Sequence, residues 1–193
     1  MERRDLGRIV AFSDGVMAVA ITLLALNIDV PDLPSSREGE LADELVDLLP
    51  SLGAYALAFA LVGRYWVIHH GLFERLRAFD GTLMVLNLVF LACIVLMPFG
   101  TELVDRYGDE PVAVAVFGAL LGFAGLANWA MVRHVIHGEL AHEERRDLTE
   151  TVSLVLTVIF FLSAAAAFLS TLLAQAMWLL SIGLRYPLRR LAG

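Results

Sequence analysis

The chain has 193 residues, of which 59% are hydrophobic, and its formal net charge at pH 7 is −7. Soluble domains contain about 45–50% apolar residues, and here the excess is grouped in long blocks, so the composition predicts a polytopic membrane protein. The acidic balance argues against nucleic acid as a partner. The single cysteine, Cys93, excludes an internal disulfide and any cysteine-rich metal site.

The first apolar block, Ile9–Ile28, contains a carboxylate, Asp14, about a third of the way along it. A charge inside a membrane span costs at least about 2.5–3.5 kcal/mol on insertion scales, so it normally has a partner. Arg8 is six residues away, which is not a helical i,i+3 or i,i+4 spacing. We therefore expect the partner of Asp14 on another helix, on another subunit or in its own backbone.

The same block has two different faces when it is drawn as a helix at 100° per residue. Val19, Thr22, Leu23 and Leu26 share an aliphatic face that carries a single hydroxyl, and Asp14 lies about 140° from Val19. A signal peptide is the competing interpretation, because Ala18-Val19-Ala20 fits a cleavage pattern. Apolar residues continue after that tripeptide and Asp14 interrupts the hydrophobic region, so we expect a retained helix.

Further apolar blocks follow along the chain, each long enough for a helix of about 20 residues that crosses a membrane, the last being the shortest. They are Leu48–Ile68, Thr82–Leu103, Pro111–Val135, Thr151–Leu173 and Ala176–Leu188. Pro98 is expected to kink the third span near its end. Gly118 and Gly122 form a small-x-x-x-small face, which favours close helix packing in the fourth span.

Arginine is concentrated in alternate connections, and the sequence has no lysine. Twelve arginines lie on one predicted side of the membrane: Arg3, Arg4, Arg8, Arg64, Arg75, Arg77, Arg133, Arg145, Arg146, Arg185, Arg189 and Arg190. Only Arg37 and Arg106 lie on the other side. The positive-inside rule therefore predicts six spans in the plasma membrane, with both termini in the cytoplasm.

The two long connections on the opposite side are acidic. The segment Asp29–Asp47 has seven acids and one arginine, and Glu102–Glu110 has four acids and one arginine. Solvated loops and a negative vestibule that concentrates cations at a pore mouth are both compatible with this charge.

Three segments resemble the transmembrane protein 175 family, which contains the lysosomal potassium channel of animals and single-repeat bacterial relatives. The pattern R-x-x-x-F-S-D-G-V-x-A-x-A-I-T-L-L begins at Arg8 and resembles the first transmembrane helix of that family. Y-W-x-x-H-H-x-L-F begins at Tyr65, and N-L…P-F-x-T begins at Asn87, in the family's order. The resemblance covers the first three spans, and beyond them the pattern is only hydrophobic.

The resemblance implies an all-α channel in which four copies of one six-helix domain, residues 1–193, surround a central pore lined by the first helices. Aliphatic rings of Val19, Leu23 and Leu26 would form the constriction, with Thr22 beside them. The family often has isoleucine at the position of Val19, so valine implies a wider ring there. A helix-packing network would join the first three helices through Arg8, Phe12, Ser13, Asp14, Trp66, and His69 or His70.

The implied function is passive, potassium-permeable conduction, and the sequence lacks the T-V-G-Y-G filter of other potassium channels. An alternative is a proton-permeable channel or transporter that uses Asp14 with His69 and His70, and a third is a non-conducting scaffold. No nucleotide loop, zinc-ligand spacing or nucleophile–base pattern predicts an enzyme. We expect no cofactor and no fixed metal; the expected partners are further copies of the chain, K⁺ and other monovalent cations, and lipid.

Overall fold

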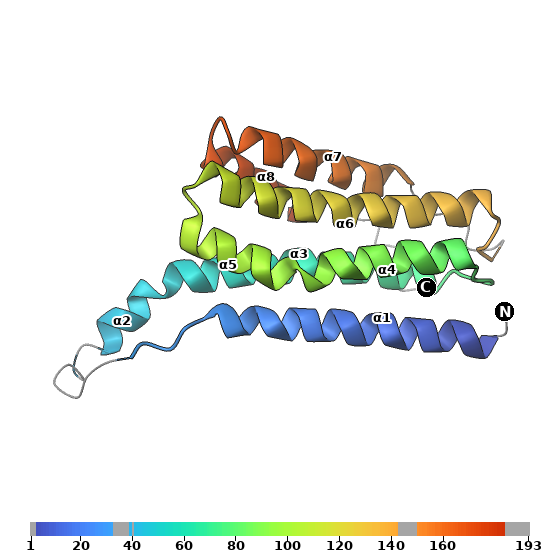
Figure 1. Ribbon diagram of the computed structural model, residues 1–193, viewed down its shortest axis with the longest axis horizontal. Coiled ribbons are helices and arrows are strands. Elements are labelled where there is room, and N and C mark those ends of the chain that lie inside the picture. The colour runs from blue at the N-terminus through green and yellow to red at the C-terminus, as the bar shows by residue number, and fades with distance from the viewer. Residues whose placement is uncertain (1–2, 33–38, 40, 143–149, 184–193) are drawn as a thin grey trace.

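The computed structural model describes residues 3–32, 39, 41–142 and 150–183, and these ranges are helical apart from turns and an isolated β-bridge. In chain order the elements are α1 (Arg3–Leu23), the 3-10 helix η1 (Leu24–Asn27), α2 (Leu41–Asp47), α3 (Leu49–Phe73), α4 (Gly81–Val95), α5 (Met97–Tyr107), α6 (Pro111–His137), α7 (Glu150–Ala166) and α8 (Thr171–Gly183). The long helices run side by side. Helix α1 lies at one edge of the bundle, and α7 lies at the opposite edge (Figure 1). The all-α expectation is confirmed.

Four helical runs are long and apolar enough to cross a membrane. They are Leu6–Asn27, Leu49–Phe73, Gly81–Tyr107 and Pro111–His137. Each matches one of the first four apolar blocks of the sequence. The last two helices are shorter, with 17 residues in α7 and 13 described residues in α8.

The third run is interrupted near Pro98, as predicted. Helix α4 ends at Val95 and α5 begins at Met97, because proline has no N–H with which to continue the hydrogen-bond ladder. The interruption is also tied to the first run, since Asn27 Nδ2 donates to the carbonyl oxygen of Pro98 at 2.8 Å. The break therefore lies where the end of η1 meets α5.

The boundary between the last two helices was predicted wrongly. We expected it between Leu173 and Ala176, but α7 ends at Ala166 and α8 begins at Thr171. Ser170 Oγ accepts the backbone N–H of Leu173, as an N-cap residue does, and thereby starts α8 earlier. The sequence does not indicate this cap, because the residues around Ser170 are apolar. The end of the last block, residues 184–188, lies outside the described residues.

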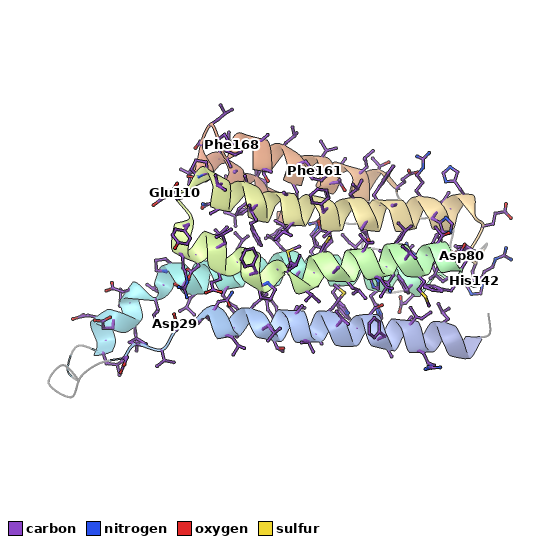
Figure 2. The ribbon with its side chains drawn as sticks, in the orientation of Figure 1. Asp29, Asp80, Glu110, His142, Phe161 and Phe168 are labelled. Atoms are coloured by element: carbon purple, nitrogen blue, oxygen red, sulfur yellow. The ribbon has the colours of Figure 1, made fainter. Side chains whose placement is uncertain are left out.

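Glycines on α6 allow α7 to pack closely against it, as predicted. A Cβ added at Gly118 would lie 2.9 Å from Ser163 Oγ and 3.1 Å from the backbone nitrogen of Ala164. At Gly122 it would meet the ring of Phe161 at 2.9 Å, and Phe161 is labelled in Figure 2. A larger residue would therefore require the backbone of α7 to move at Gly118 and the ring of Phe161 to move at Gly122.

Connections alternate between the two ends of the bundle. Asp80 and His142 lie at one end, near the N-terminus, and Asp29, Glu110 and Phe168 lie at the other (Figures 1 and 2). At the first end, an isolated β-bridge pairs the turn after α3 with the turn after α6. Among the arginines used for the topology, Arg37, Arg145, Arg146, Arg185, Arg189 and Arg190 lie outside the described residues.

Candidate functional site on the first helix

Helix α1 attaches to the bundle through one narrow stripe. The stripe consists of Ser13, Met17, Ala20 and Leu24, each at most 2% exposed, and their spacing of three or four residues places them on one helical face. Asp14 lies at the border of this stripe and is partly buried. Leu6, Ile9, Val10, Val16 and Ile21 are partly buried beside the stripe, and the opposite side of the helix is exposed in the single chain.

The predicted aliphatic face of α1 lies on that open side. Val19 is 58% exposed and Leu23 39%, and Leu26, which the structure places in η1 directly after α1, is 74% exposed. Thr22 is also exposed, and its hydroxyl donates to the carbonyl oxygen of Val19 at 2.8 Å. Because the hydroxyl hydrogen is occupied within the helix, the oxygen remains an acceptor for a group outside it.

Asp14 finds a partner on α3. The indole Nε1 of Trp66 donates to Asp14 Oδ1 at 3.0 Å. The Trp66 ring stacks on His70, with ring centroids 5.1 Å apart, and His70 Nε2 lies 3.2 Å from Glu74 Oε1. The carboxylate on α1 is therefore held by a tryptophan whose ring is itself fixed one turn further along α3.

A second, buried connection joins α1, α3 and α4. Asn87 Nδ2 donates to Ser13 Oγ at 2.9 Å, and Asn87 Oδ1 lies 2.8 Å from His69 Nε2. With the amide in this orientation, His69 Nε2 carries the hydrogen. All three side chains are at most 2% exposed, so each polar group depends on the others.

Aromatic rings enclose His69 on both sides. Its ring stacks on Phe73 with centroids 4.2 Å apart and on Phe90 with centroids 5.1 Å apart. Among the described residues, no hydrogen-bond partner reaches His69 Nδ1, which is buried. The imidazole therefore acts in this fold as a flat, single-donor connection between helices.

The residues expected to join the helices are thus only partly brought together. Ser13, Asp14, Trp66 and His69 form the interhelical bonds, and His70 contributes through its stacking on Trp66. Arg8 and Phe12 are exposed on α1, and Arg8 has no hydrogen bond or ion pair with the described residues. Asn87 was not among the expected members. The signal that points to it is a single amide within an otherwise apolar helix.

The described residues include no group of three or more histidine, cysteine, aspartate or glutamate side chains that could hold a metal ion. The open face of α1 offers methyl groups and one hydroxyl oxygen. Such a surface can exclude water and line a narrow path, but it has no nucleophile or general base for a reaction.

A family model described as "Endosomal/lysosomal potassium channel TMEM175" matches residues 8–98, from α1 to the start of α5. A protein of Streptomyces collinus that is named a potassium channel is 38% identical over 133 residues, which are 67% of this chain and 64% of that one. A mouse protein named "Endosomal/lysosomal proton channel TMEM175" is 35% identical over 135 residues, 64% of this chain and 27% of that one. This chain therefore spans less than two thirds of each of these relatives.

The likeness extends to a solved structure over almost the whole chain. It is the crystal structure of a lysosomal potassium-selective channel TMEM175 homolog from Chamaesiphon minutus, with a TM-score of 0.83 and 28% sequence identity. The superposition covers 94% of this chain and 96% of that one. The later helices, whose sequence pattern is only hydrophobic, are thus included in the shared fold.

Proposed function

The chain belongs to the TMEM175 family, and from this premise we propose that it forms a passive, potassium-permeable cation channel. The family consists of ion channels, not enzymes. The observation that carries the proposal is the open aliphatic face of α1, where Val19, Leu23 and Leu26 are 39–74% exposed although the helix is apolar. In a membrane protein, lipid or further copies of the chain cover a row of large apolar side chains at the edge of one chain, and we assign this row to further copies.

We propose that residues 1–193 form one domain with six spans and that four copies assemble around an axis lined by α1. In this arrangement α7 and α8 serve as the fifth and sixth spans, and local thinning of the bilayer and snorkelling of flanking residues compensate for their short described lengths. An even number of spans puts both termini on the same side of the cell membrane, and the arginine bias of the connections makes that side the cytoplasm. Cyclic symmetry repeats each α1 residue as a ring.

The side chains of these rings then determine which ions pass through the pore. Leu23 and Leu26 have no ligand for an ion, so their rings block hydrated cations by size and by dewetting. Thr22 adds an acceptor oxygen between the levels of Val19 and Leu23. Val19 is shorter by one methylene and gives a wider ring. The polar bonds of Asp14 and Ser13 lie on the other side of the helix, where they position α1 and do not contact the ion.

The test is ion flux into liposomes that contain the purified protein, under K⁺, Na⁺ and H⁺ gradients. Potassium flux that exceeds protein-free liposomes supports the channel. No flux for any of the three ions in correctly assembled protein contradicts it and favours a non-conducting scaffold.

Proton permeation is the second candidate. It is favoured by the buried imidazole of His69, which lies one residue from His70 and is linked through Asn87 to α1. Proton flux that exceeds K⁺ flux and that His69→Gln removes would support this alternative. Equal proton flux in both proteins would contradict it.

A further inference from the structure

A cavity of about 600 Å³ lies between α3, α5 and α8. It is at the end of the bundle where Glu110, one of its lining residues, is labelled in Figure 2, opposite Asp80. Its volume is within the range of about 300–1,000 Å³ that is typical of small-molecule sites. None of the residues proposed for conduction or for the interhelical bonds of α1 lines it.

The wall of this cavity has an apolar part made by three helices. Leu57 of α3, Val104 of α5, and Trp178 and Leu179 of α8 contribute to it. Trp178 is fully buried and its indole N–H donates to Ser163 Oγ at 2.8 Å. Its only donor is therefore occupied, and the ring closes the base of the cavity without an exposed surface of its own. Gly53 leaves this part open, because nothing lies within 4 Å of a Cβ added there.

The rim is negative. Asp105, Asp109 and Glu110 belong to the lining, and none of them forms an ion pair with the described residues. Arg106 also lines the cavity, but Glu102 neutralises it across 2.8 Å. Tyr107 is 55% exposed at the same rim, and aromatic rings attract cations through their faces. Negative charge and an aromatic ring thus adjoin an apolar interior.

From this combination we propose a binding site for an organic ammonium ion that carries an apolar tail. The ammonium group is held at the rim by Asp105 and Asp109, and the tail lies beside Gly53 against Leu57 and Leu179. An anion of the same shape is rejected by the carboxylates. Two kinds of molecule supply such an ammonium group, namely an ethanolamine lipid through its headgroup and a soluble amphipathic amine.

The charge requirement is tested by calorimetric titration of the purified full chain in non-ionic detergent with hexyltrimethylammonium and, separately, with hexanesulfonate. We expect saturable binding of the cation alone. Asp105→Asn is expected to weaken it about two- to fivefold, the effect typical of an exposed charge pair. Asp29→Asn removes one carboxylate at the same end but outside the cavity, and should leave binding unchanged. Equal weakening by both variants, or equal binding of the anion, overturns the proposal.

The shape requirement is tested by filling the cavity. Gly53→Leu projects a side chain into the opening and is expected to weaken binding by at least about tenfold, without loss of thermal stability. Gly63→Leu is the matched control, since Gly63 lies on the same helix with nothing near its added Cβ and outside the lining. Undiminished binding to Gly53→Leu overturns the proposal.

The source of the ammonium group is determined by mass spectrometry of the lipids that stay with the protein after extraction. If the unmodified protein retains ethanolamine lipid in preference to glycerol lipid, and Gly53→Leu does not, the bound ammonium group is the lipid headgroup. Probe binding without such retention identifies a soluble amine. If the protein neither binds the probe nor selectively retains ethanolamine lipid, the proposal is overturned.

Discussion

Trp66 on α3 donates its indole N–H to Asp14 on α1 across 3.0 Å, and this bond explains how a carboxylate is accommodated within an apolar helix. Asp14 lies beside the buried stripe of α1 and away from the aliphatic face. The bond therefore fixes the rotation of α1 about its own axis. If α1 lines the pore, the rotation set by this pair determines which side chains face the axis.

The first prediction is that Asp14→Ala impairs assembly and stability more than ion preference. A hydrogen bond to a charged group contributes about 1.5–3 kcal/mol, and partial exposure places this one at the lower end. Size-exclusion chromatography and thermal unfolding in detergent measure the effect. Trp66→Phe keeps an aromatic ring beside His70 but removes the N–H, so it should reproduce most of the loss. An assembled Asp14→Ala protein with altered selectivity alone would place Asp14 on the ion path.

The second prediction concerns the amide of Asn87. Asn87→Leu leaves Ser13 and His69 buried without their partners, at a cost of about 1–3 kcal/mol for each unsatisfied group. We therefore expect a larger loss of thermal stability than from Asp14→Ala. Asn27→Leu is the comparison, because its bond to Pro98 is only partly buried. A smaller loss at Asn87 than at Asn27 would show that the buried connection contributes little.

The sequence predicts the features of α1 that depend only on helical geometry. A wheel at 100° per residue separates Asp14 from Val19, and the structure places Asp14 at the bundle and Val19 on the open side. The same regularity locates the first four spans and the Gly118–Gly122 face. These features follow from local periodicity, which requires no knowledge of neighbouring helices.

Contacts between helices could not be derived in the same way. That Asn87, and not a charged residue, meets His69 depends on how α3 and α4 rotate and slide against each other, which periodicity does not encode. The α7–α8 turn was misplaced for another reason. Ser170 is a single polar residue within an apolar stretch, and only its hydrogen bond to Leu173 distinguishes a cap from a residue inside a helix.

The third prediction is an acid-labile link at the end of the bundle near the N-terminus. The backbone N–H of Leu83 donates to Asp80 at 2.8 Å, and this bond, followed by that with His134 Nε2 at 2.8 Å, lowers the pKa of Asp80 below its ordinary value of 3.8. A lowered pKa stabilises the fold above that ordinary value. The stabilisation is then lost as the pH falls below about 4.

Thermal unfolding between pH 2.5 and 6 measures this link. Asp80→Asn should reduce stability near neutral pH and flatten the acid limb of the curve, because asparagine has no proton to bind. Asp29→Asn serves as the control, since Asp29 lies at the other end of the bundle (Figure 2). An acid limb of the same steepness in Asp80→Asn and in the unmodified chain would contradict the prediction.

The fourth prediction tests the contact between α6 and α7. In Gly118→Ala the new Cβ would lie 3.1 Å from the backbone of Ala164, which cannot rotate away. Overpacking of this kind costs about 1–3 kcal/mol, so the midpoint of thermal unfolding should fall. Gly63→Ala is the matched control on α3, where the added Cβ meets nothing within 4 Å. Equal midpoints for the two variants would mean that α7 shifts at no cost.

The last prediction concerns Leu23, which is 39% exposed on the aliphatic face of α1. If its side chains meet on the axis, Leu23→Ser widens and wets the constriction, so flux rises and potassium preference falls. Leu26→Ser should act alike, and Thr22→Val should lower selectivity by removing the hydroxyl oxygen that lies beside the Leu23 ring.

Leu24 is the control that separates a pore face from a packing face, because it follows Leu23 directly yet is fully buried. Leu24→Ala removes core volume and should cost about 2–5 kcal/mol of stability, with no gain in flux for each assembled channel. Liposome flux and single-channel current, measured beside thermal unfolding, distinguish the two effects. If Leu24→Ala increased conduction while Leu23→Ser only destabilised the protein, the pore would lie on the side of α1 that faces Asn87. The open aliphatic face would then be a surface for packing between subunits.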